Sequence, residues 1–198
     1  YGLSCEEYAL TFSLIGLYEC MKYFKNNFFG KWNCFFIGML CSLCFFIRAN
    51  LVSVFAAFGI AIAIKLIVEK KYKELLKYVV FSLLGFLFVG LFIFIYLIKF
   101  NCIEDFFNWV FILNMSLNKC GLIVSILSIF MKIPLTFLVI IVFFVSVSKR
   151  FFLKRDFKYF AISLYIIITI LFNSLSSTVF LHYLISFIPI ILFSFNNL

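Results

Sequence analysis

Long apolar runs, separated by short polar gaps, dominate this chain. The longer runs reach the roughly 20 apolar residues that are needed to cross the hydrocarbon core of a bilayer. Backbone groups in lipid must be paired within the segment, so each run is predicted to form a helix. The sequence therefore predicts an all-α, polytopic membrane protein. The runs cover residues 6–24, 33–64, 78–98, 121–148, 159–173 and 180–195.

The run over residues 33–64 is too long for one crossing, and it has basic gaps at both ends. We therefore expect a helical hairpin whose turn lies at Ile47–Asn50, the polar break in this run. Lys132 and Pro134 interrupt the run over 121–148, so its spanning part is expected to begin near Pro134. About seven crossings result, within a single membrane-embedded domain over residues 1–198.

The basic residues set the expected orientation of these crossings. The chain has 17 Lys and Arg residues and a formal net charge of +9, and most of the basic residues lie in three polar gaps. The positive-inside rule assigns these gaps to the cytoplasmic face of a cell membrane, with the first residues extracytoplasmic. This distribution indicates anionic lipid rather than nucleic acid as the partner of the charge. The three groups are Lys22, Lys25 and Lys31; Lys65, Lys70, Lys71, Lys73 and Lys77; and Lys149, Arg150, Lys154, Arg155 and Lys158.

This orientation brings the remaining polar candidates to the outer face. Glu6 and Glu7 precede the first run, Arg48 and Asn50 lie in the hairpin turn, and His182 and Tyr183 enter the last run. Glu104 and Asp105 lie in a further segment, residues 102–116, which is predicted to be an amphipathic helix on the outer surface. Charge beside a membrane segment is costly to desolvate, which marks these residues as candidates for function.

Each candidate also has a structural interpretation. Ser4 and Glu7 fit a capping box, which leaves Glu6 unexplained. Asn101 and Glu104 fit a second helix start, and Arg48 can extend to lipid headgroups while Asn50 caps the next helix. Glu6 and His182 are candidate metal or substrate ligands. One histidine needs further ligands to hold a metal.

Several classes of chemistry find no support in the sequence. It contains no nucleophile elbow, P-loop, zinc-protease or dinucleotide motif, so no nucleotide or flavin cofactor is expected. Cys41 and Cys44 form a C-x-x-C pattern inside an apolar run, where free cysteine acts as a small hydrophobe. Cys102 and Cys120 flank the outer segment and are a candidate disulfide.

Four short motifs, in order, resemble those of bacterial GT-C-type membrane glycosyltransferases, the relatives of dolichyl-phosphate-mannose protein mannosyltransferases. E-E-Y-A-L-T-F from Glu6 is similar to their S/T-E-E-Y-A-L-P-F. F-F-I-R-A-N-L, which contains Arg48, is similar to F-L-I-R-P-N-L. I-E-D-F-F, which contains Glu104, and H-Y-L, which begins at His182, resemble L-D-D-F and H-Y-x-x-x-x-x-P. The chain departs from the pattern at Cys5, Thr11 and Ala49, and Ala49 removes the proline expected after Arg48.

The resemblance implies transfer of a sugar from a polyprenyl-phosphate donor to a cell-envelope glycan, lipid or protein acceptor on the outer face. It also implies a divalent metal, and it matches Arg48 and Asn50 to the donor phosphate. Glu6, Glu7, His182 and Tyr183 match metal or substrate positions. The family places its catalytic base in the first outer loop, so we expect that residue to precede Tyr1 and the chain to be a fragment.

Two alternative functions remain open. A polysaccharide polymerase or ligase also uses lipid-linked sugars. A transporter or flippase for such lipids is predicted to carry polar or broken helices at mid-membrane depth, whereas the charged candidates of this chain are expected to cluster at one face of the membrane.

Overall fold

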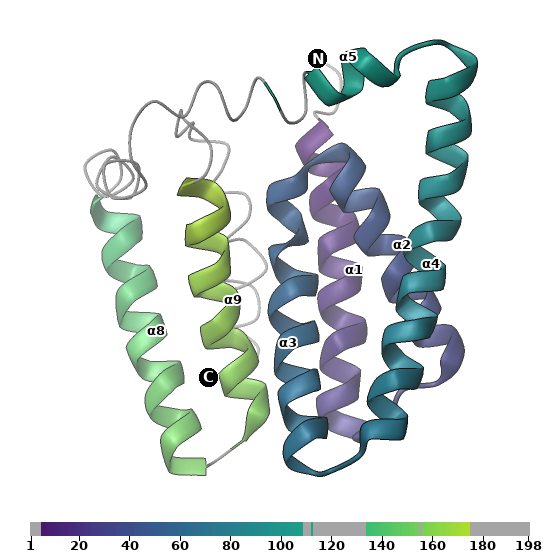
Figure 1. The fold of residues 1–198 in the computed structure, drawn as a ribbon. Coiled ribbons are helices and arrows are strands. Elements are labelled where there is room, and N and C mark those ends of the chain that lie inside the picture. The colour runs from purple at the N-terminus through teal and green to yellow at the C-terminus, as the bar shows by residue number, and fades with distance from the viewer. Residues whose placement is uncertain (1–4, 109–111, 113–133, 155, 175–198) are drawn as a thin grey trace.

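The computed structural model describes residues 5–108, 112, 134–154 and 156–174 (Figure 1). These residues form seven α-helices and one 3-10 helix, with no strand among them, which confirms the all-α class. The helices are α1 (Cys5–Asn26), α2 (Lys31–Ile47), η1 (Ala49–Val52), α3 (Ser53–Val68), α4 (Tyr72–Lys99), α5 (Ile103–Phe107), α8 (Pro134–Lys154) and α9 (Phe157–Ser174).

The long helices run alternately up and down, side by side (Figure 1). α4 packs on α2, α2 packs on α1, α1 packs on α3, and the hairpin of α8 and α9 attaches through α9 to α3. The described members of the three basic groups fall at one end of this row, which we call the basic end. Arg48 and α5 lie at the opposite end, which we call the arginine end.

Two predicted helix boundaries are confirmed. α2 ends at Ile47, Arg48 follows in an extended conformation (φ −156°, ψ 98°), and α3 begins after η1. α8 begins at Pro134, where a proline costs no helical hydrogen bond. The predicted hairpin differs in one respect: α2 and α3 are consecutive but pack little on each other, because α1 and α4 take the neighbouring positions.

The predicted helix cap at Asn101 is wrong. Asn101 has φ 53° and terminates α4, where its N–H donates to the Ile98 carbonyl (3.1 Å) and the Cys102 N–H donates to the Leu97 carbonyl (2.9 Å). This is a Schellman-type helix end, and asparagine tolerates its left-handed backbone. The N-cap of α5 is Cys102, which makes no side-chain cap hydrogen bond. Asn50 does not cap α3 either, because it lies within η1 and Val52 is the N-cap of α3.

The crossing of α2 and α4 depends on small residues. A Cβ atom added to Gly38 of α2 would overlap the backbone carbonyl of Ser82, and one added to Gly85 of α4 would overlap that of Phe35. Ser42 lies one turn after Gly38 on α2 and is fully buried. Such spacing of small residues allows close backbone approach in membrane helix pairs.

One described helix, α4, is long and apolar enough to span a membrane by length and composition, and only 11% of its apolar window is buried. α2, α3 and α9 are apolar but shorter. Six leucine or phenylalanine side chains of α4 are about half exposed or more, namely Leu83, Leu84, Leu87, Phe88, Leu91 and Phe92.

Candidate functional site

Several elements meet around Arg48 at the arginine end. Arg48 separates α2 from η1, and η1 contacts α1 and α9 as well as its two neighbours. The Phe46 ring lies 5.8 Å from the Phe106 ring, which attaches α5 to the end of α2. The Cys44 thiol donates to the Ala9 carbonyl (3.4 Å), which attaches the first turns of α1 at the same level. These contacts hold α5 and the first turns of α1 at the end of the bundle where Arg48 lies.

Arg48 is held by its backbone on both sides. Its N–H donates to the Cys44 carbonyl (2.7 Å), and its own carbonyl accepts from the Leu51 N–H (3.1 Å). The chain therefore breaks here without the proline of the resembling motif. The side chain is half-buried. A guanidinium in this position can present its planar fork of donors to a phosphate or carboxylate.

The acidic candidates of α5 are solvent-facing. Glu104 and Asp105 are exposed in its first turn, while Phe106 turns inward to Phe46. This division supports the amphipathic character predicted for residues 102–116, of which the structure describes a helix over Ile103–Phe107. Cys102 is a free thiol, and Cys120, its partner in the candidate disulfide, lies outside the described residues.

The acidic pair at the start of α1 is described only in part. Glu7 is exposed, and its backbone carbonyl accepts a hydrogen bond from the Thr11 hydroxyl (3.0 Å). Ser4 and the side chain of Glu6 lie outside the described residues, so the proposed capping box stays a prediction. His182 and Tyr183 also lie outside them, as does the side chain of Asn50.

The sequence interpretation missed a buried polar row on α9. Tyr165, Thr169 and Asn173 are at most 2% exposed, and the Thr169 hydroxyl donates to the Ser53 hydroxyl of α3 (3.0 Å). Their spacing of four residues could have predicted this row, because it places all three side chains on one helix face.

The described residues do not fit the divalent metal that the resemblance implies. Among them, no three His, Cys, Asp or Glu side chains are grouped closely enough to hold an ion. Glu104 and Asp105 are neighbours on α5, but two exposed carboxylates fall short of a coordination sphere.

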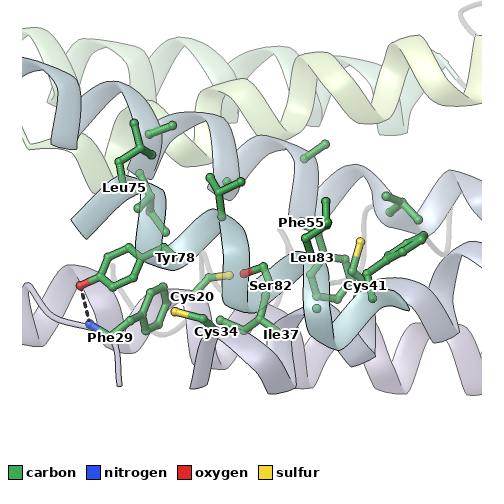
Figure 2. A pocket seen from close by; sticks show the side chains of 18 residues that line it. Cys20, Phe29, Cys34, Ile37, Cys41, Phe55, Leu75, Tyr78, Ser82 and Leu83 are labelled. Atoms are coloured by element: carbon green, nitrogen blue, oxygen red, sulfur yellow. Dashed lines mark hydrogen bonds between the residues drawn. The ribbon is translucent and has the colours of Figure 1, made fainter. Parts of the chain in front are cut away.

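A second feature is an apolar cavity of about 430 Å³ between α1, α2, α3 and α4. Its lining is almost entirely hydrocarbon and sulfur, with the thiols of Cys20, Cys34 and Cys41 and the hydroxyls of Tyr78 and Ser82 as the polar exceptions (Figure 2). At one end the Tyr78 hydroxyl accepts a hydrogen bond from the Phe29 N–H (3.0 Å). No sequence pattern predicted this cavity.

Comparison of the chain with known protein families, curated proteins and solved structures finds no match in any of the three.

Proposed function

We propose that this chain is part of a membrane glycosyltransferase that takes a sugar from a polyprenyl-phosphate donor at the outer membrane face. The observation that carries the proposal is the convergence at the arginine end. There Arg48, which is half-buried, follows α2, α5 carries Glu104 and Asp105, and α1 begins with Glu7 in its first turn, at the end of the bundle opposite the three basic groups. An arginine at the same end of the bundle as several hydrogen-bond acceptors suits a sugar phosphate.

The proposed setting is a bilayer crossed about seven times, with the basic end in the cytoplasm. The exposed apolar face of α4 supports it, because a soluble surface rarely carries so large a contiguous apolar area. Trp32 gives a second indication. It is 81% exposed at the basic end, and exposed tryptophan is typical of the headgroup layer.

The orientation can be tested by thiol labelling of intact cells with a membrane-impermeant maleimide, mapped by mass spectrometry of peptides. We expect label on the free thiol of Cys102 beside α5. A cysteine introduced by Lys70→Cys, in the loop between α3 and α4, is expected to react only after the membrane is permeabilised. Label on residue 70 in intact cells would reverse the proposed orientation.

In the proposed reaction Arg48 binds the donor phosphate, with the amide of Asn50 as a second donor. The acceptor hydroxyl attacks the anomeric carbon from the face opposite the phosphate, and the bond from that carbon to the phosphate oxygen breaks. Negative charge grows on the departing polyprenyl phosphate, where a fixed guanidinium is most stabilising. The proton of the acceptor hydroxyl passes to the catalytic base, which the resemblance places in the first outer loop of the family.

The carboxylates have a supporting role in this proposal. Glu104 and Asp105, exposed on α5, can accept hydrogen bonds from sugar hydroxyls. Glu6, with Glu7, His182 and Tyr183, is proposed to complete the donor site or to hold the implied metal. Their assignment rests on the resemblance alone.

Replacing Arg48 with alanine tests the proposal most directly. Loss of charge-assisted hydrogen bonds worth about 2 kcal/mol is expected to weaken binding of a polyprenyl-phosphate sugar about thirtyfold. The measurement is a donor titration of the purified protein in nanodiscs. Arg150→Ala is the matched control, because it removes the same side chain at the basic end. Equal donor affinity in the two variants would contradict the phosphate role.

The transporter alternative is less well supported by the described residues. A path for a sugar phosphate needs polar groups at mid-depth, whereas the cavity between α1 and α4 is lined almost wholly by apolar groups. A polymerase or ligase would use the same phosphate contact. Analysis of the product separates these enzymes, since the transferase adds one sugar per acceptor.

A further inference from the structure

The cavity between α1, α2, α3 and α4 opens sideways, between α3 and α4. Val79 and Leu83 of α4 line the cavity, yet they are 53% and 56% exposed, so they form its margin. On the α3 side, Gly59 lines it and is exposed, and a Cβ atom added there meets nothing within 4 Å. The two helices contact each other little away from their loop, which leaves this lateral mouth.

The size and lining of the cavity suit one hydrocarbon chain. Its volume of about 430 Å³ is roughly three times that of an apolar cavity that holds benzene, which corresponds to roughly 15 carbon atoms. Apolar cavities of this kind stay free of water. In the proposed membrane setting, the mouth faces the hydrocarbon layer, where lipid acyl chains are available to occupy the cavity.

The loop below the mouth is basic. Residues 65–77 carry five lysines and two glutamates, and Lys70 and Lys71 lie in the loop that joins α3 to α4. Lys71 donates to the Glu69 carboxylate (2.7 Å), and this contact raises the pKa of the Lys71 ammonium group. Lys70 and Lys73 have no carboxylate partner within the described part of the chain. Unpaired lysines at the cytoplasmic surface attract anionic headgroups.

We propose that an anionic phospholipid of the inner leaflet inserts one acyl chain between α3 and α4 into this cavity, with its phosphate at Lys70 and Lys73. This inference rests on the proposed membrane location but not on sugar transfer. The site is distinct from the proposed donor site, because the lysine loop and Arg48 lie at opposite ends of the bundle.

The test is native mass spectrometry of the protein released from nanodiscs of equal parts phosphatidylglycerol and phosphatidylcholine. We expect one retained phosphatidylglycerol per chain. Gly59→Leu places a side chain in the cavity without meeting backbone, so it is expected to reduce the retained fraction about tenfold or more. Ile60→Phe is the control, because Ile60 is 45% exposed and does not line the cavity.

The headgroup contact is tested separately with Lys70→Asn combined with Lys73→Gln. Asparagine tolerates the left-handed backbone of Lys70 (φ 58°). The preference for phosphatidylglycerol over phosphatidylcholine is expected to fall about fivefold per lysine removed. Lys149→Gln with Lys158→Gln removes the same charge near the α8–α9 connection and is expected to leave the preference unchanged.

Two results would overturn the proposal: retention in Gly59→Leu equal to the unchanged protein, or no initial preference for phosphatidylglycerol. The membrane location is checked on the same samples by flotation with vesicles after a carbonate wash. A protein that fails to float refutes the membrane location itself. If the lipid is retained but donor binding is insensitive to Arg48→Ala, the proposed function is refuted and the lipid site is not.

Discussion

Gly38→Leu is expected to separate α2 from α4 and to lower the free energy of unfolding by about 3 kcal/mol. The physical reason is backbone proximity: a Cβ at residue 38 would overlap the Ser82 carbonyl and come within 3.0 Å of the Phe86 nitrogen. A carbonyl within a helix cannot rotate away as a side chain can. The helices must therefore move apart along their whole contact, which is the largest helix pairing in the described structure.

The measurement is unfolding of the purified protein by sodium dodecyl sulfate in mixed micelles, followed by circular dichroism. Gly59→Leu provides a matched control, because it makes the same chemical change on α3, where a Cβ meets nothing within 4 Å. Its unfolding free energy is expected to stay within about 1 kcal/mol of the starting value. Because leucine has a higher helix propensity than glycine, helix propensity alone predicts no loss in either variant. Equal losses in the two variants would show that the added side chain itself, and not the α2–α4 approach, determines the effect.

Phe58→Ala is expected to cost about 4 kcal/mol of unfolding free energy. Phe58 is 0% exposed in the middle of α3. Its ring centre lies 6.1 Å from that of Phe24 on α1 and 6.4 Å from that of Tyr165 on α9. Truncation leaves a cavity where these three helices meet. The α8–α9 hairpin joins the rest of the described bundle chiefly through α3, so its attachment is expected to weaken first.

Limited proteolysis, compared with the same detergent titration, separates the weakened attachment of the α8–α9 hairpin from the loss of unfolding free energy. Cleavage between α8 and α9 at a lower detergent concentration than loss of helicity would indicate early release of the hairpin. Phe94→Ala is the control, because Phe94 lies on the exposed face of α4 with 46% of its surface accessible. If Phe58→Ala is no more costly than this control, α3 is not the centre of the bundle.

The candidate site was partly accessible to sequence reasoning. Arg48 interrupts an apolar run between two basic gaps, so charge distribution alone placed it in a turn at the end opposite the lysines. The cap assignments at Asn50 and Asn101 were wrong for a local reason. Both residues suit several positions in a helix terminus, and the 3-10 turn and the end of α4 used them differently.

The apolar runs and basic gaps of the sequence determined the helical class, the break at Arg48, the start of α8 at Pro134 and the alternation of the helices. Those features depend on local periodicity, charge and backbone preference. Only the tertiary structure decided that α2 packs on α4 rather than on α3, and that Tyr165, Thr169 and Asn173 face inward. Glycine contacts and side-chain shape select helix partners, and they act between residues far apart in the chain. The cavity beside Gly59 follows from that choice of partners, so no stretch of sequence predicts it alone.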